Sequence, residues 1–268
     1  LALPAAPALA QGSQLRFIVP NAPGGTSDIL ARLMAPELGR ILGQTVIVEN
    51  RAGAGGNIGL DLVAKAQPDG NTLIILDVTT IATNPAFFPR LPFRTADLAP
   101  VTMVVYAPYI LGVAPSLNIA DARAFEAWAR ANPARVNAAN SGSGTASHLS
   151  LVMLAEGWGI QVTHVPYRGG APALLATSTG EATMTVAGAT QSLPLATDGR
   201  MRPIAVTGPR RLPQLPEVPT FRELGWNGPD AGTWQGVLTT AGTPRPRVEA
   251  LNAALREAMA VPAVAERI

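Results

Sequence analysis

Residues 15–42 constrain the fold more than any other stretch, because they carry the pattern of a buried strand, a glycine turn and a helix. A short apolar run rich in β-forming residues comes first, and Pro20 ends it. The turn Pro23-Gly24-Gly25 follows, and its glycines put no side chain in the way of a ligand. Thr26-Ser27-Asp28 then supplies cap and first-turn residues for a helix. The apolar residues of that helix recur at helical spacing: Ile29, Leu30, Leu33, Met34, Leu38, Ile41 and Leu42.

A helix that begins at such a turn is able to bind an anion, because its first N–H groups are unpaired and carry a partial positive charge. Glycine and a hydroxyl cap also occur at many strand-to-helix turns for packing reasons alone, so one turn does not identify a site. A second turn of the same chemistry spans residues 140–148, between a β-like segment and an apolar helical run. Two anion-accepting turns in the two halves of the chain predict a cleft between two lobes.

Strand-like and helix-like segments alternate along the chain, which favours an α/β fold with parallel sheets. Strands are predicted at 45–49, 72–76, 101–113, 136–139, 162–165, 182–186, 204–206 and 234–239, and further helices at 60–66, 120–131, 171–176 and 248–259. We expect Pro36 to kink or interrupt the first helix, and residues 85–100 to be irregular. Ligands of parallel sheets gather beyond the carboxyl ends of the strands, where we expect Gly24, Gly25, Thr79 and Thr80.

The composition excludes several classes of function. With 47% hydrophobic and 14% charged residues the chain is not disordered, and 268 residues fit two modest domains. The net charge is only +2 and the basic residues are scattered, so neither nucleic acid nor an anionic membrane is an expected partner. The absence of cysteine removes thiol catalysis, disulfides and cysteine-based metal sites. Residues 50–59 are glycine-rich but match neither G-x-G-x-x-G in register nor G-K-[ST], so no cofactor is expected.

The first ten residues resemble the end of a secretory signal. They are apolar and close in the small-x-small sequence Ala8-Leu9-Ala10, which predicts a mature protein that starts near Gln11. We therefore expect residues 1–12 to be a signal-peptide remnant or leader, and the protein to be exported to the periplasm. A disordered alanine- and proline-rich leader is the alternative. No later segment is apolar enough over a sufficient length to span a bilayer, so no direct membrane insertion is expected.

Five sequence blocks, in this order and spacing, resemble the extracytoplasmic solute receptors of the Bug family, the binding proteins of tripartite tricarboxylate transporters. The blocks are VPNAPGGTSD at 19–28, VENRAGAGGNIG at 48–59, AQPDG at 66–70, GSGT at 142–145 and VPYRG at 165–169. The resemblance extends from about residue 15 to the C-terminus. A single block would be weak evidence, whereas the ordered set is specific.

This resemblance implies an α/β fold of the two-lobed periplasmic-binding-protein type II class, with each lobe a mainly parallel sheet flanked by helices. Residues 13–108 and 220–268 would form lobe 1, and residues 109–219 would form lobe 2. The family holds small carboxylates through main-chain amides, hydroxyls and waters, so the resemblance implies a mono-, di- or tricarboxylic acid, aromatic acids included. It also implies a monomer that serves membrane transporter subunits, without catalytic residues or a metal.

Together, the two turns and the resemblance predict one set of ligand contacts, with Thr79, Thr80, Tyr167, Ala187 and Thr190 added to the turns themselves. The set is Pro23, Gly24, Gly25, Thr26, Ser27, Asp28, Thr79, Thr80, Ser143, Gly144, Thr145, Ala146, His148, Tyr167, Ala187 and Thr190. Several members have a structural alternative. An acidic first-turn residue such as Asp28 favours the helix dipole, His148 could be a packed or supporting residue, and Tyr167 could be buried for area alone. Arg51 and Arg168 could also pair with a carboxylate.

Three features depart from the family pattern. Ala187 and Gly188 stand where the family often has an acidic residue and an asparagine, which predicts a wider pocket with fewer hydrogen-bond groups there. The chain also looks shortened at its C-terminus, and Pro36 falls where relatives keep an unbroken helix. The identity of the ligand therefore does not transfer from the family.

Other classes of function remain as alternatives at this point. A serine-dependent hydrolase or acyl transferase would use Ser143 or Ser147 with His148 or His164, but G-x-S-x-G and an acidic orienting residue are both missing. A metalloenzyme would lack ligands, since the two histidines form no H-E-x-x-H motif. A ligand-sensing regulator of similar fold would need an attached DNA-binding or signalling segment.

Overall fold

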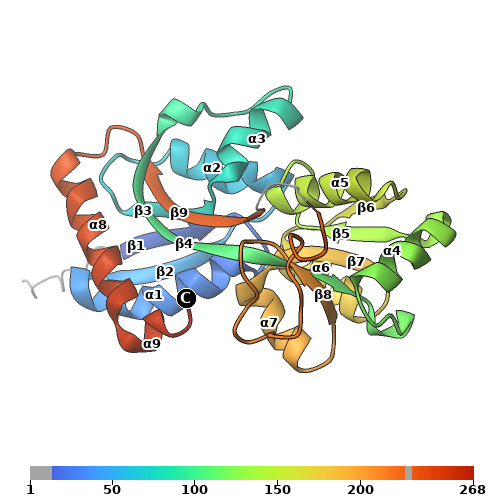
Figure 1. The fold of residues 1–268 in the computed structure, drawn as a ribbon. Helices are drawn as coiled ribbons and strands as arrows, with labels where there is room; N and C mark the ends of the chain where they lie inside the picture. The colour runs from blue at the N-terminus through green and yellow to red at the C-terminus, as the bar shows by residue number, and fades with distance from the viewer. Residues whose placement is uncertain (1–13, 227–230) are drawn as a thin grey trace, which may run out of the picture.

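The strand pairing divides the molecule into two halves that share one long strand, β4 (Leu98–Val113) (Figure 1). The structure is a computed structural model that describes residues 14–226 and 231–268. Up to Pro108, β4 pairs with β9 (Gly232–Thr240), whereas from Tyr109 onward it pairs with β7 (Met184–Gly188) and β8 (Arg202–Val206). Each half therefore has its own set of strands, and β4 crosses between them.

The first half is a sheet in the order β2-β1-β3-β9-β4. Its three N-terminal strands are parallel to one another, and β9 runs antiparallel to both of its neighbours. The remaining elements of this half are β1 (Gln14–Val19), α1 (Thr26–Leu42), β2 (Thr45–Asn50), α2 (Asn57–Ala64), β3 (Thr72–Asp77), α3 (Thr79–Phe87), α8 (Arg245–Ala260) and α9 (Pro262–Ala265).

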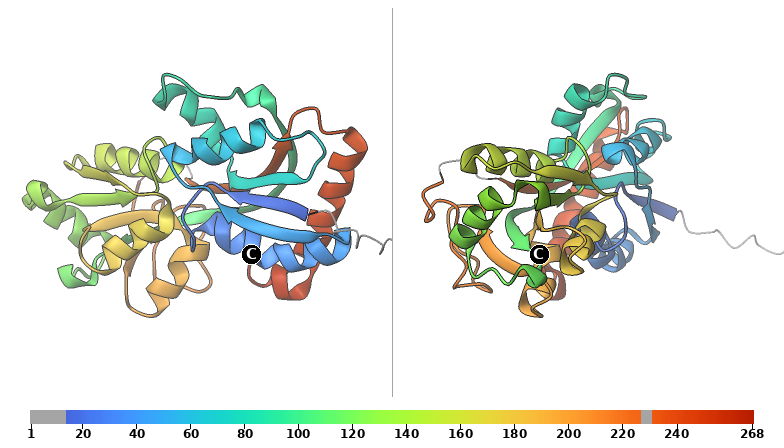
Figure 2. Two further views of the ribbon diagram at one scale, coloured as in Figure 1. Left: turned by 180° about the vertical axis from the view of Figure 1, so that it is seen from behind. Right: turned by 90° about the vertical axis from the view of Figure 1, so that its right-hand side faces the viewer.

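The second half repeats this arrangement with β5 between β6 and β7 in parallel, and with β4 antiparallel to β7 and β8. Its remaining elements are α4 (Ala122–Ala131), β5 (Asn137–Asn140), α5 (Ala146–Trp158), β6 (Thr163–Pro166), α6 (Gly170–Ser178) and α7 (Ala189–Thr197). Views from behind and from the side show helices on both faces of each sheet (Figure 2).

Helices on both faces explain why the central strands read as continuous apolar runs. In β3, Leu73 and Ile75 belong to the core beneath α1 and α8, while Ile74 and Leu76 belong to the core beneath α2. All four side chains are buried because alternate residues of a strand point to opposite faces. The polar residues that follow the apolar run of β3 therefore lie at the carboxyl edge of the sheet.

The predicted strands, and the helices at 120–131, 171–176 and 248–259, are confirmed to within three residues at their ends. Three local expectations are wrong. Helix α1 continues unbroken through Pro36, helix α3 covers part of the stretch expected to be irregular, and helix α7 was not predicted. The predictions for residues 1–12 lie outside the described residues.

Physical reasons account for these differences. A proline inside a helix costs about 3 kcal/mol, whereas the buried side chains of Leu30, Met34 and Leu38 on α1 contribute roughly 1.5–3 kcal/mol each. Helix α3 is rich in threonine and contains a proline, so its sequence has weak helical propensity. A contact with α2 stabilises α3, because the buried Asn84 amide of α3 donates to Asn57 Oδ1 of α2 at 2.5 Å. Across residues 14–226 and 231–268, no helix has both the length and the apolar character of a membrane span.

Candidate ligand-binding site

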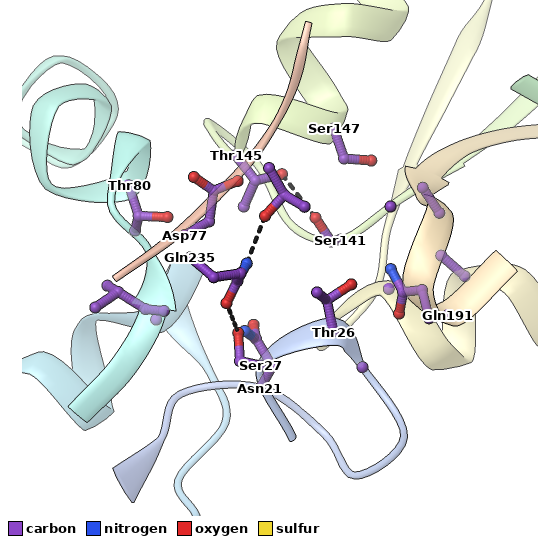
Figure 3. Close-up of a pocket in the computed structure, with 18 of the residues that line it drawn as sticks. Asn21, Thr26, Ser27, Asp77, Thr80, Ser141, Thr145, Ser147, Gln191 and Gln235 are labelled. Carbon is purple, nitrogen blue, oxygen red and sulfur yellow. Dashed lines mark hydrogen bonds between the residues drawn. The ribbon is translucent and has the colours of Figure 1, made fainter. Parts of the chain in front are cut away.

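A small cavity of about 60 Å³ lies where the two halves meet, and both contribute to its wall (Figure 3). From the first half come the start of α1, the end of β3 and two side chains of β9. From the second half come the turn that precedes α5 and the junction of β7 with α7. The polar side chains of the wall include Thr26, Ser27, Asp77, Ser141, Thr145 and Gln191.

The start of α1 presents polar groups that lack partners. In the described part of the chain, no side chain caps this helix, whose N-cap is Gly25 in extended backbone. The Thr26 hydroxyl is buried, lines the cavity and has no hydrogen-bond partner among the described residues. Ser27 is held differently, since its hydroxyl donates to Gln235 Oε1 at 2.7 Å. Free helix N–H groups beside a buried, unpaired hydroxyl form a site for an anion's oxygen atoms.

Asp28 stabilises the turn from behind. Its carboxylate accepts hydrogen bonds from the Gly24 N–H at 2.9 Å, from Asn50 Nδ2 at 2.9 Å and from Arg32 Nε at 3.0 Å. Burial opposes its ionisation, but these three hydrogen bonds outweigh burial and lower the pKa of Asp28. The side chain does not line the cavity. Asp28 therefore has a structural role in shaping the Gly24 turn.

The second turn is organised by a threonine and a histidine. Thr145 caps α5, accepting from the His148 N–H at 3.4 Å, and its hydroxyl donates to the Gly142 carbonyl at 2.7 Å. The Gly144 N–H in turn donates to His148 Nδ1 at 3.2 Å. Burial and the neighbouring His164 ring lower the pKa of His148, so the ring is neutral and Nδ1 is available as an acceptor. His148 thus fixes the turn, while Thr145 faces the cavity.

This geometry does not favour serine catalysis. The Ser147 hydroxyl donates to the Val186 carbonyl at 2.6 Å rather than to a histidine. Ser143 does not line the cavity. A nucleophilic serine needs a base within hydrogen-bond reach, and no serine–histidine side-chain pair of that kind occurs among the residues that the structure describes. The same residues contain no cluster of three potential metal ligands.

Six of the sixteen predicted contact residues line the cavity: Gly25, Thr26, Ser27, Thr80, Thr145 and Ala187. The other ten do not line it: Pro23, Gly24, Asp28, Thr79, Ser143, Gly144, Ala146, His148, Tyr167 and Thr190. Tyr167 is among these, and its hydroxyl donates to Glu181 at 2.8 Å in an exposed pair. Arg51 pairs with Glu49, and Arg168 contributes a backbone carbonyl, which accepts from the Ala22 N–H at 2.9 Å. Contact of any of these residues with a ligand stays a prediction.

Sequence reasoning missed the side chains at the centre of the cavity. Asp77 ends β3, Tyr109 lies on β4, and Thr233 and Gln235 are buried on β9. Figure 3 shows Gln235 bridging to Ser27 on one side, and its amide donates to Thr233 on the other. The available signal for Thr233 and Gln235 was their alternate spacing at the start of β9, which puts both side chains on the same face of the strand.

The two halves touch closely around the cavity. Gly188 of β7 packs so tightly on the first half that a Cβ there would lie 2.9 Å from Thr26 Oγ1 and 3.1 Å from Thr233 Cγ2. Phe87 of α3 reaches the other half, where its ring meets the edge of His148 with centroids 6.0 Å apart. Glycine at 188 therefore permits an approach that a larger residue would prevent.

Comparison with known proteins supports the resemblance seen in the sequence. The model of the family described as "Tripartite tricarboxylate transporter family receptor" matches residues 30–268. Periplasmic binding protein BugD is 32% identical, with a TM-score of 0.90 over 95% of this chain and 85% of that one. MatC from Rhodopseudomonas palustris, solved with malate, is 32% identical, with a TM-score of 0.89 over 95% and 87% of the two chains. Rpa4515 of R. palustris, solved with adipate, is 34% identical, with a TM-score of 0.89 over 94% and 84%.

The family model covers most of the chain, and the fold agrees closely with solved periplasmic binding proteins at more than 30% identity. The predicted α/β periplasmic-binding-protein fold is thus confirmed. The chain belongs to the tripartite tricarboxylate transporter receptors of the TctC/Bug family, which are solute-binding receptors and not enzymes.

Proposed function

We propose that this protein is a periplasmic receptor that captures a small carboxylate in the cavity between its halves and presents it for uptake by membrane transporter subunits. The observation that carries the proposal is the uncapped start of α1, where the buried Thr26 hydroxyl lacks a partner among the described residues. Relatives of known structure hold malate and adipate, which supports a carboxylate as the ligand class. We further propose that the receptor acts as a monomer.

The two halves would act as the lobes of a hinge. In this proposal lobe 1 comprises residues 13–108 and 220–268, lobe 2 comprises residues 109–219, and the division falls where β4 changes its partners. A ligand that touches both lobes binds the closed state more tightly than the open state. Only this difference in affinity is able to shift the equilibrium toward closure. One carboxylate would lie on α1 at Thr26, and Thr145 would contribute from the opposite lobe.

Isothermal titration against a panel of mono-, di- and tricarboxylic acids, malate and adipate included, tests the proposal. We expect Thr26→Val to weaken binding of the preferred acid by roughly 10- to 150-fold, because a hydrogen bond to a charged group is lost. Thr145→Val should also weaken binding, since it removes both the second-lobe hydroxyl and the α5 cap. Thr197→Val is the matched control, because its exposed hydroxyl bonds only within α7.

Unchanged affinity in both cavity variants would reject the site. Thermal stabilisation by the same acids, without any turnover of them, separates a receptor from a hydrolase. Each acid that binds should raise the midpoint of thermal unfolding with increasing concentration, since it binds only the folded protein.

A further inference from the structure

One acid stands in the wall of a cavity that otherwise suits an anion. Asp77, at the end of β3, is the only charged side chain among the described residues that line it, and no arginine, lysine or histidine lines it. The positive partial charge at the cavity comes from helix N-termini, which are backbone groups. A second negative charge on the ligand would therefore meet Asp77 without a cation to balance it.

The hydrogen bonds of Asp77 come from neutral donors. Oδ1 accepts from the Thr79 hydroxyl at 2.8 Å, from the Thr79 N–H at 3.1 Å and from the Trp234 N–H at 3.4 Å. Oδ2 accepts from the Tyr109 hydroxyl at 3.3 Å, which is a long hydrogen bond. These donors orient the carboxylate and leave its charge uncompensated. Removing a charge from water is unfavourable unless an opposite charge faces it.

A short row of polar side chains lies between Asp77 and the start of α1. Ser27, on the first turn of α1, donates to Gln235, and Gln235 donates to Thr233 (Figure 3). The Thr233 side chain in turn lies beside the Asp77 carboxylate. Only two side chains, Gln235 and Thr233, thus lie between an anion-accepting helix start and the half-buried Asp77 carboxylate. A molecule with opposite charges a few bonds apart matches this pair of sites.

We propose that the ligand is a small amino acid, whose carboxylate lies on the first turn of α1 and whose protonated amine lies on Asp77. The inference rests on the proposed carboxylate receptor and narrows its ligand class. A zwitterion brings no net charge into a cavity whose side chains already carry one negative charge.

The directions of two pKa shifts agree with this assignment. Burial raises the pKa of Asp77, and it raises the pKa of Tyr109, the titratable side chain that contacts Asp77, well above its usual value. Tyr109 consequently remains a donor across the accessible pH range. An ammonium group placed on Asp77 would favour the ionised carboxylate, so amino acid binding should weaken as acid protonates Asp77.

Two sets of size-matched acids test the proposal by isothermal titration: propionate, lactate and alanine, and succinate, malate and aspartate. In the wild type we expect the amino member of at least one set to bind at least tenfold more tightly than the unsubstituted member. Asp77→Asn should reduce that preference to about threefold or less. Asp61→Asn is the matched control, because Asp61 pairs with Lys65 on the surface of α2 and should leave the preference unchanged.

Each other outcome has a distinct meaning. Binding of unsubstituted or hydroxy acids as tight as that of amino acids, or an amine preference that survives Asp77→Asn, overturns the amino acid assignment while leaving the carboxylate receptor intact. Failure of every acid to bind overturns the receptor proposal itself. If Asp77→Asn does not fold, titration of the wild type at several pH values tests the proposal instead. The preference for amino acids over unsubstituted acids must shrink as pH is lowered, and a constant preference overturns the proposal.

Discussion

Gly188→Ala should weaken ligand binding without destabilising the ligand-free protein. Gly188 has ordinary extended dihedrals, φ −58° and ψ 141°, so alanine adopts its backbone conformation without strain. The new methyl group would meet Thr26 Oγ1 at 2.9 Å and Thr233 Cγ2 at 3.1 Å. Both partners belong to the first half, whereas Gly188 belongs to the second. The overlap therefore exists only while the halves are closed on each other.

The magnitude follows from the cost of overpacking. Forcing an extra methyl group into packed surroundings costs about 1–3 kcal/mol. The open state avoids this cost, so the variant destabilises only the closed state, to which the ligand binds tightly. The dissociation constant should therefore rise by roughly 5- to 150-fold. The midpoint of thermal unfolding of the ligand-free protein should stay near that of the wild type, because the variant relieves the overlap by opening.

Gly39→Ala is the matched control. Its Cβ would approach the Gln44 carbonyl oxygen at the same 2.9 Å, but both residues lie in the first half. This overlap persists whether the halves are open or closed. We expect the control to lower the midpoint of unfolding by roughly 2–4 °C for each kcal/mol lost, with an unchanged dissociation constant.

Isothermal titration and thermal melts measure the two quantities, and small-angle X-ray scattering at saturating ligand reports whether the variant still compacts. The reasoning is refuted if Gly188→Ala binds as tightly as the wild type while Gly39→Ala loses stability as expected. That pattern would mean that the halves do not close against each other in solution.

Three further predictions concern single side chains. The Arg16 guanidinium lowers the pKa of Glu49 to about 2. The ion pair therefore stabilises the fold above the unfolded pKa of about 4.5, and this stabilisation is lost as pH falls toward 2. In urea unfolding, Glu49→Gln should cost about 1 kcal/mol of unfolding free energy at pH 7 and nothing near pH 2. Asn84→Ala should cost roughly 1–3 kcal/mol in the same assay, because it leaves the buried Asn57 oxygen without that donor. Phe87→Ala should weaken ligand binding severalfold in titration while the ligand-free melting point changes little, since its ring contacts the other half; an unchanged affinity would count against that contact in solution.

Features that depend on neighbouring residues were predictable from the sequence. The turn at Gly24 and Gly25, the hydroxyl after it and the helix beyond lie within a few residues of one another, and the structure has them in this order. The second turn is equally local, with Thr145 as the cap of α5. Helix α3 was missed because its stabilising contact comes from Asn57, 27 residues earlier in the chain. Helical propensity is a local property and does not predict such a long-range contact.

The centre of the cavity has the opposite character, and this explains why sequence reasoning did not reach it. In the sequence, Asp77 is one of several polar residues at strand ends. Its place in the site becomes visible only from its neighbours in the structure, Tyr109 of β4 and Thr233 of β9. Strand β4 crosses between the halves and β9 pairs with both β3 and β4, so the residues that surround the acid come from three distant parts of the chain. The turns supply the general means of holding a carboxylate. What distinguishes one ligand from another would then lie in the long-range contacts around Asp77, and two receptors with the same turns would differ in ligand when that position differs.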